Sequence, residues 1–158
     1  DGEMFPTEIG SQWQSVGDAF RSGAVVSFHN DGSVSPPLPL WNIQAAVTRA
    51  SFSGKVHGAE QKISLDDALK AQTINGAIHL FRDTEIGSIE AGKFADFVQL
   101  AADPYEVDPM TISQIKVEGT WRSGKRINLD AFIAEVQSVD PSEHADLHEH
   151  AHKNSHRC

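Results

Sequence analysis

Residues 24–32 read Ala24-Val25-Val26-Ser27-Phe28-His29-Asn30-Asp31-Gly32, so an apolar run passes directly into polar residues. The run is rich in β-branched residues and follows Gly23. An apolar run of this kind, without a polar face, predicts a buried strand of a parallel sheet. A parallel strand needs strand neighbours, and no other segment of the chain matches it in quality. We therefore expect the strand at 24–28 to belong to a sheet whose other strands lie outside this sequence.

Three helices are expected around this strand. Apolar residues at spacings of three and four predict a helix over 13–20, a second over 43–50 and a longer third over 64–81. Ser64 can accept a hydrogen bond from the Asp67 amide and so cap the third helix. Asn75 interrupts the pattern of that helix, and we expect its side chain to hydrogen-bond to the strand segment.

The second half of the chain changes to a period of two. Short strands are predicted over 97–100 and 115–121, followed by a turn at 123–125 and the start of a return strand. A last helix over 129–139 precedes a polar segment, 140–158, which holds five of the eight histidines.

Composition narrows the classes of function. The chain has 158 residues, 13 Lys and Arg and 22 Asp and Glu, which gives a net charge of −9. This charge has the wrong sign for a nucleic-acid backbone or an anionic membrane surface, so we expect neither as a partner. The single cysteine, Cys158, cannot form an intramolecular disulfide. No apolar run reaches the length of a membrane span. The compartment stays open, with the cytoplasm favoured.

Two motifs in one order resemble the metal-dependent amidohydrolases, in particular their exoenzyme-like subgroup. The first motif is VVSFHNDGSVSPPLPL at residues 25–40, followed by IQAAVTR at 43–49. The second motif is SLDDAL at 64–69 and TINGA at 73–77, followed by GSIEAGKFADFV at 87–98. The resemblance covers residues 11 to 128.

This resemblance implies an α/β fold that contains the last βα unit of a (β/α)₈ barrel and part of a small β-sandwich. Residues 1–81 would be the C-terminal barrel strand and helices, 82–137 the sandwich segment, and 138–158 a histidine-rich polar tail. A complete barrel takes about 250 residues, more than this chain has. We therefore expect the chain to be the C-terminal part of a longer protein. It would associate with the remainder of that parent or with further copies of itself.

The resemblance assigns the central chemical role to Asp31. In the family an aspartate just after the last barrel strand binds a divalent metal, most often zinc. It also accepts a proton from the water that attacks a carbon–nitrogen bond outside a peptide. The substrate would be a small molecule of the amide type. Without the resemblance, a simple turn in which the aspartate caps its own backbone is the favoured interpretation of Asp31-Gly32.

Four further residues are candidates for the substrate pocket. His29 either faces the same pocket as Asp31 or is an ordinary surface or packed histidine. Ser33 and Ser35 either line the pocket or only build a rigid turn. Trp41 is most simply a core or interface aromatic, but it directly follows the proline loop and is the tryptophan best situated to border the pocket. By contrast, we expect Arg49, at the end of its helix, to complement the helix dipole and not to bind an anion.

The family's other metal ligands have no counterpart in this sequence. The resemblance thus implies that the intact parent is a hydrolase and that this chain alone is inactive, possessing only Asp31 of the metal site.

The histidine-rich tail supports a second hypothesis, a non-catalytic metal-binding or interaction module. His144, His148, His152 and His156 are each four residues apart and would share one face of a helix. Imidazoles brought together in this way bind zinc or nickel. The simpler interpretation is a solvated tail that does not fold.

Overall fold

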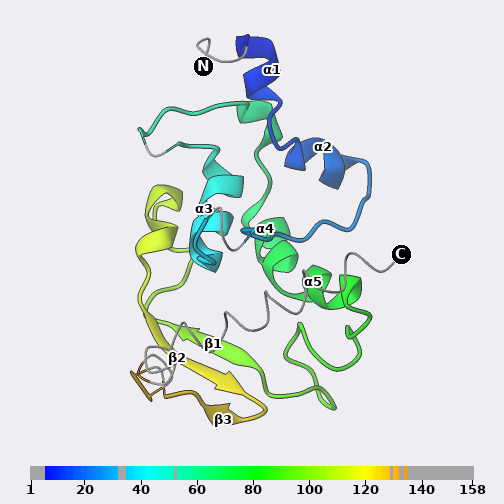
Figure 1. Cartoon of the computed structure of the whole chain (residues 1–158), viewed down its shortest axis with the longest axis vertical. Coiled ribbons are helices and arrows are strands. Elements are labelled where there is room, and N and C mark those ends of the chain that lie inside the picture. The colour runs from blue at the N-terminus through cyan, green and yellow to red at the C-terminus, as the bar shows by residue number, and fades with distance from the viewer. Residues whose placement is uncertain (1–5, 32–34, 52, 129, 132–133, 135–158) are drawn as a thin grey trace, which may run out of the picture. The chain divides into compact units, whose positions relative to one another are not determined.

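The computed structural model describes residues 6–31, 35–51, 53–128, 130–131 and 134. Figure 1 shows the order of the elements along the chain. The N-terminal part contains α1 (Thr7–Ser11), α2 (Val16–Arg21), α3 (Pro39–Thr48), the 3₁₀ helix η1 (Ala59–Gln61), α4 (Leu65–Gln72) and α5 (Ile74–His79). The C-terminal part contains β1 (Phe97–Leu100), the 3₁₀ helix η2 (Pro109–Gln114), β2 (Val117–Arg122) and β3 (Lys125–Arg126).

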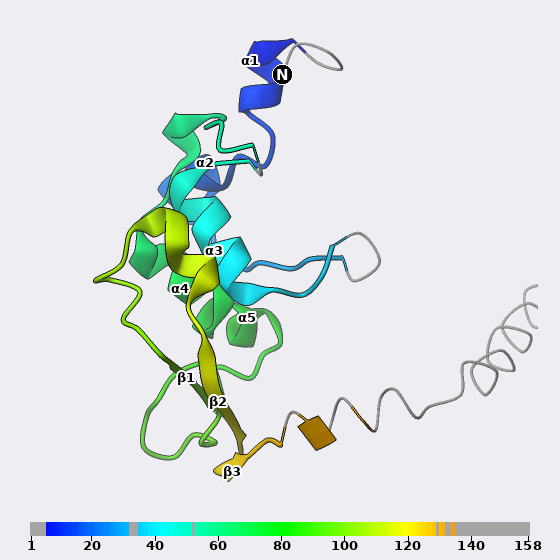
Figure 2. The same ribbon diagram turned by 90° about the vertical axis from the view of Figure 1, so that its left-hand side faces the viewer.

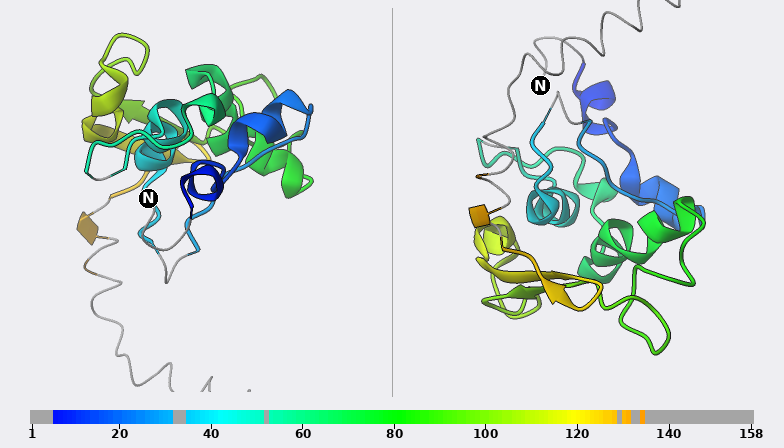
Figure 3. Two further views of the ribbon diagram at one scale, coloured as in Figure 1. Left: turned by 90° about the horizontal axis from the view of Figure 1, so that it is seen from above. Right: turned by 60° about the horizontal axis from the view of Figure 1, so that its bottom comes forward.

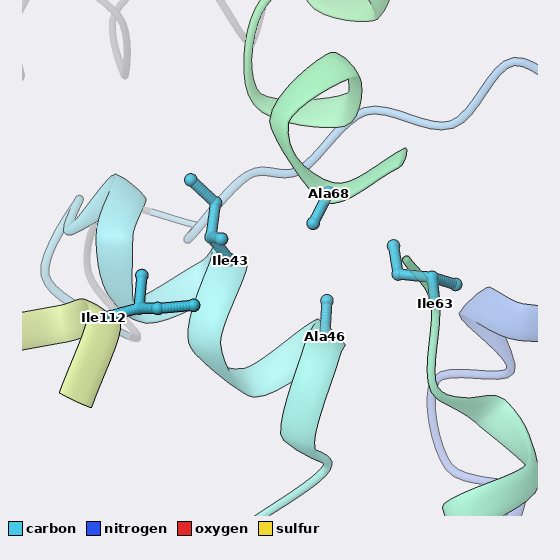
Figure 4. Packing of buried hydrophobic residues seen from close by; sticks show 5 residues of the cluster. All are labelled: Ile43, Ala46, Ile63, Ala68 and Ile112. Carbon is cyan, nitrogen blue, oxygen red and sulfur yellow. The ribbon is translucent and has the colours of Figure 1, made fainter. Parts of the chain in front are cut away.

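The core lies where α3, α4 and η2 meet. Its buried residues are Ile43, Ala46, Ile63, Ala68 and Ile112. Figure 4 shows the methyl groups of Ala46 on α3 and Ala68 on α4 directed toward each other. Small side chains at this contact allow the two helices to lie close together. Ile112, which has no exposed surface, fills the space between α3 and η2, and Figure 3 shows these two elements side by side.

Segment 24–28 is not a strand in this structure, which corrects the prediction for it. It is also less buried than expected, since Val25 is 47% exposed. Its polar groups bond to three positions spaced four residues apart on α4 and α5. Phe28 donates its amide to the Ala71 carbonyl at 3.3 Å, Asn75 Nδ2 donates to the Val26 carbonyl at 2.8 Å, and His79 Nε2 lies 3.2 Å from the Val25 carbonyl. Within the described ranges no strand lies beside this segment, so helical groups supply the partners that a sheet would supply.

The contact of Asn75 with segment 24–28 confirms that part of the sequence analysis. The same segment also selects the tautomer of the neutral His79 ring. A carbonyl oxygen can only accept, so His79 Nε2 carries the proton toward Val25, and Nδ1 accepts from the Ser27 hydroxyl at 2.7 Å.

The predicted helix over 64–81 is two helices, α4 and α5. Ser64 caps α4 as expected, because its Oγ accepts from the Asp67 amide at 3.1 Å. The break lies at Thr73, where φ is −128° and ψ is −96°. The Thr73 hydroxyl donates to the Leu69 carbonyl at 2.6 Å, and its amide bonds instead to Lys70 at 3.1 Å. The side chain thus takes the acceptor that a continuous helix would give to the backbone.

The predicted helix over 13–20 is also shorter than expected. The helix α2 begins only at Val16, because Gln14 has a φ of +54°, outside the helical region. Gly23, with a φ of +80°, follows the end of α2 as the sequence indicated.

A three-stranded sheet with the order β1-β2-β3 forms the C-terminal part of the fold. The strands β1 and β2 are antiparallel, with Phe97 opposite Trp121 and Val98 opposite Thr120. The rings of Phe97 and Trp121 stack with their centroids 4.7 Å apart. The expected strands over 97–100 and 115–121 are therefore present, the second beginning at Val117. Membership of this sheet in a β-sandwich stays a prediction.

Contacts divide the chain into two units, 1–125 and 126–158, and the site described below lies in the first. The proposed division at residues 81 and 137 stays a prediction. Most of the expected helix over 129–139 and the whole polar segment 140–158 lie outside the described residues. No helix in the described part of the chain is both long and apolar enough to span a membrane.

Candidate functional site

A pocket of about 470 Å³ lies between the linker that precedes α2, segment 26–30 and one face of α3. The described residues that line it combine hydroxyl and amide side chains, one imidazole and one guanidinium with five apolar side chains, and include no carboxylate. They include Gln14, Ser15, Ser27, His29, Asn30, Ser35, Asn42 and Arg49. Such a lining offers hydrogen bonds to an uncharged polar molecule.

Two amide side chains fasten the loop after segment 24–28 to α3. Asn30 Nδ2 donates to Asn42 Oδ1 at 3.0 Å, and Asn42 Nδ2 donates back to Asn30 Oδ1 at 2.8 Å. Ser35, on the returning limb of the loop, donates from Oγ to the Asn30 carbonyl at 2.8 Å. Figure 2 shows the two limbs running side by side from the N-terminal end of α3. The loop therefore has a fixed base.

Asp31 is the first residue beyond this base and is exposed. Its φ is +52°, in the left-handed region that aspartate adopts more readily than most residues. The Asp31 amide donates to Nδ1 of His29 at 3.2 Å. The acceptor is the imidazole, so this bond does not involve the Asp31 carboxylate. The alternative turn at Asp31-Gly32 stays a prediction, because Gly32 lies outside the described residues.

The hydrogen bond from the Asp31 amide also restricts the tautomer of the His29 ring. Since Nδ1 accepts a hydrogen bond, the neutral ring carries its proton on Nε2. In this tautomer His29 presents a donor to its surroundings and not a lone pair for a metal. Asp31 is then the one residue of this loop, among those described, whose side chain is ready to bind a cation. No group of three or more His, Cys, Asp or Glu side chains suited to a metal occurs among the described residues.

Arg49 borders the pocket at the end of α3 and holds backbone together. Its guanidinium donates to three carbonyl oxygens: Trp13 at 2.7 Å, Gln14 at 3.2 Å and His57 at 3.1 Å. Burial lowers the pKa of Arg49, and the negative charge of Glu60 partly offsets this. With these carbonyls bound, Arg49 acts as a structural clamp on the linker that precedes α2. This agrees with the structural interpretation of Arg49, although carbonyl binding and not the helix dipole alone supports it.

The structure separates the remaining candidates. His29 and Ser35 line the pocket. Trp41 instead lines a different hollow, of about 340 Å³, together with Gln44, Met110 and Ser113. Ser33 lies outside the described residues. Sequence reasoning missed Asn30 and Asn42 as partners, because two asparagines twelve residues apart form no recognisable motif.

Comparisons with known proteins agree on one family. A family model described as "Amidohydrolase family" matches residues 3–127. The N-substituted formamide deformylase of Arthrobacter pascens is 32% identical over 111 residues, which are 70% of this chain and 20% of that protein. The imidazolonepropionase of Bacteroides thetaiotaomicron is 41% identical over 63 residues, which are 40% of this chain and 15% of that protein.

A solved structure has a similar fold. The crystal structure of an amidohydrolase from Thermotoga maritima MSB8 superposes with a TM-score of 0.55 at 22% identity, covering 72% of this chain and 25% of that one. The chain thus spans about a fifth of the length of the deformylase and a quarter of the solved structure.

Proposed function

The chain belongs to the amidohydrolase family, and we propose that it is the C-terminal part of a metal-dependent hydrolase that cleaves carbon–nitrogen bonds outside peptides. The observation that carries this proposal is the family match over 3–127, which includes the Asp31 loop and the pocket beside it. We propose Asp31 as a metal ligand and as the general base.

The donor set around Asp31 suits a shared metal site. Catalytic zinc sites use about three protein ligands, and the described residues offer one carboxylate at this loop. The other ligands would come from the remainder of a longer protein, and the 158-residue chain alone would be inactive. A divalent metal, with zinc favoured, would supply Lewis acidity there.

The residues of this chain would divide the remaining work. The Asp31 carboxylate would take the proton of the attacking water, and the His29 Nε2–H would donate to a substrate oxygen, which the position of His29 in the pocket lining supports. Ser33 and Ser35 would shape the pocket. The hydroxyl and amide groups of the lining, beside apolar side chains and without a carboxylate, fit an uncharged amide-type small molecule, and the formamide named for the Arthrobacter relative is a substance of this class. The proposal that Trp41 borders the substrate pocket has less support, because Trp41 lines the other hollow.

The test uses the longer protein that carries this chain, loaded with zinc, and an N-substituted formamide as substrate. We expect Asp31→Asn to reduce kcat by about 10²- to 10⁴-fold, because the variant loses the general base. The control is Asp96→Asn, since the Asp96 Oδ1 atom accepts from the Ser123 amide at 2.6 Å and an asparagine oxygen can do the same. Full activity in Asp31→Asn would contradict the proposal, and so would hydrolysis by the 158-residue chain alone.

The second hypothesis, a metal-binding module built on the tail, has weaker support. The family match ends at residue 127, before the histidines of the tail, and those histidines lie outside the described residues.

A further inference from the structure

We infer that Asn42 is a positioning residue for Asp31, acting through the side chain of Asn30. The inference deepens the proposed function and rests on it for its catalytic meaning. The structural part of the inference does not depend on that function. The pair of side-chain amides, Asn42 on α3 and Asn30 on the loop, fixes the position of the residue that precedes Asp31.

The two amides form a closed pair. Each side chain uses one N–H and its oxygen toward the other, at 3.0 Å and 2.8 Å. A reciprocal pair requires each partner both to donate and to accept, which the primary amides of asparagine can do and a leucine side chain cannot. Both residues are partly buried at the pocket, where such bonds are stronger than in open water. A carboxylate or an alkyl group at position 42 would lose one or both bonds.

Two further contacts secure the pair from either side. The Asn30 amide also donates to Ser35 Oγ at 3.3 Å, which links the two limbs of the loop. On α3, the Asn42 amide also lies 3.4 Å from Oε1 of Gln72, the last residue of α4. The loop is bonded directly to Asn42 on α3, and through Asn42 it is connected to Gln72 on α4.

Asp31 depends on this attachment because nothing else holds it in the described part of the loop except its own amide bond to His29. Its left-handed backbone is a conformation that an unrestrained chain seldom adopts. Holding the side chain of Asn30 restrains the residue that immediately precedes this conformation. Asn42 thus acts on the carboxylate through one side chain and one peptide bond.

The first experiment measures amide proton exchange by NMR in the 158-residue chain. We expect Asn42→Leu to speed exchange of the Asp31 amide about tenfold, and Asn42→Asp to give an intermediate rate because it keeps one of the two bonds. Asn30→Leu combined with Asn42→Leu should be no faster than Asn30→Leu alone, since Asn30→Leu already removes the pair together with the bond to Ser35. Unchanged exchange at Asp31 in Asn42→Leu would overturn the inference.

The matched control is Gln44→Leu. Gln44 lies two residues further along α3, and its Oε1 accepts from the Ser113 amide of η2 at 2.8 Å. The Gln44→Leu substitution removes a hydrogen bond between α3 and η2 and leaves the contacts of the loop unchanged. We expect exchange at Asp31 to stay unchanged in this variant. Equal acceleration in Gln44→Leu would show a general loosening of α3 and would also overturn the inference.

The second experiment uses the longer, zinc-loaded protein and the formamide substrate. We expect Asn42→Leu to lower kcat about tenfold with little change in KM. The substitution would disorder the Asp31 carboxylate, which is the proposed general base, and would leave most substrate contacts in place. A change confined to KM would contradict a positioning role. If Asp31→Asn left hydrolysis intact while Asn42→Leu still accelerated exchange, the proposed function would fail and the structural coupling would stand.

Discussion

The side-chain amide of Asn75 donates a hydrogen bond to the backbone carbonyl of Val26 at 2.8 Å, across 49 positions of sequence. Together with Ala71 and His79, Asn75 forms a row along α4 and α5 that binds segment 25–28. The row places the segment, and with it the loop that begins at His29, against the helices. The position of the candidate site therefore depends on helical side chains that take no part in its chemistry.

Removing the Asn75 amide should destabilise the chain. We expect Asn75→Ala to lower the free energy of unfolding by about 1–3 kcal/mol, because the Val26 carbonyl loses its partner in a partly buried place. Urea denaturation measures this. Asn128→Ala is the control, since Asn128 makes an exposed bond only three residues away, to the Ala131 amide. Equal effects of the two variants would contradict the role given to Asn75.

Gly58 should not tolerate a side chain. Its φ is +61°, and a Cβ atom would lie 1.9 Å from the Ser11 carbonyl oxygen. We expect Gly58→Ala to separate α1 from the 57–58 turn and to destabilise the chain by more than the roughly 1–2 kcal/mol that a left-handed conformation alone costs an alanine. Gly54→Ala is the control, because Gly54 has a φ of +79° with nothing within 4 Å of the added atom. Thermal unfolding compares them, and similar melting temperatures would contradict the close approach.

Ile112 should be the most sensitive position of η2. It has no exposed surface and joins η2 to the core. Ile112→Ala leaves a cavity between η2 and α3, and we expect a loss of about 2–5 kcal/mol in unfolding free energy. Met110→Ala, at a position that is 41% exposed in the same element, should cost far less. Equal losses would show that η2 does not pack as described.

Asp18 should make stability depend on pH in the acid range. The hydrogen bond from Arg21, at 2.5 Å, and a second from Gln61, at 2.8 Å, lower the pKa of Asp18 from its ordinary value of 3.8. A lowered pKa means that the stabilising contribution is fully present above 3.8 and is lost as the pH falls through the lower value of the folded state. We expect the difference in stability between the parent chain and Asp18→Asn to shrink on acidification. A difference that stays constant with pH would contradict the assignment.

Local signals predicted those parts of the fold that local interactions determine. The Ser64 cap, the strands β1 and β2 and a helix expected over 43–50 follow from residues within a few positions of one another, although the structure has that helix at Pro39–Thr48. The break at Thr73 could not be predicted in this way, because threonine also occurs inside helices. In the structure the Thr73 hydroxyl bonds to the Leu69 carbonyl, and the backbone leaves the helical region at this residue.

Segment 24–28 shows a different reason for a wrong prediction. Its composition is that of a buried strand, but a strand is defined by its partners, and the described residues supply helical partners instead. At the candidate site, the sequence named His29 and Asp31 as candidates, and their roles stay predictions, whereas the Asn30–Asn42 pair was not predicted at all. The pair arises only from tertiary contact, and neither asparagine is distinctive by itself.

The row of Ala71, Asn75 and His79 also bears on how this protein behaves at high concentration. An exposed apolar segment rich in valine is a template on which strands of other molecules can assemble into aggregates. Here the carbonyls of Val25 and Val26 and the amide of Phe28 are already bound within the molecule. A strand from another molecule would have to break these hydrogen bonds before it could pair with segment 25–28. The intramolecular bonds to the helices therefore disfavour aggregation through this segment.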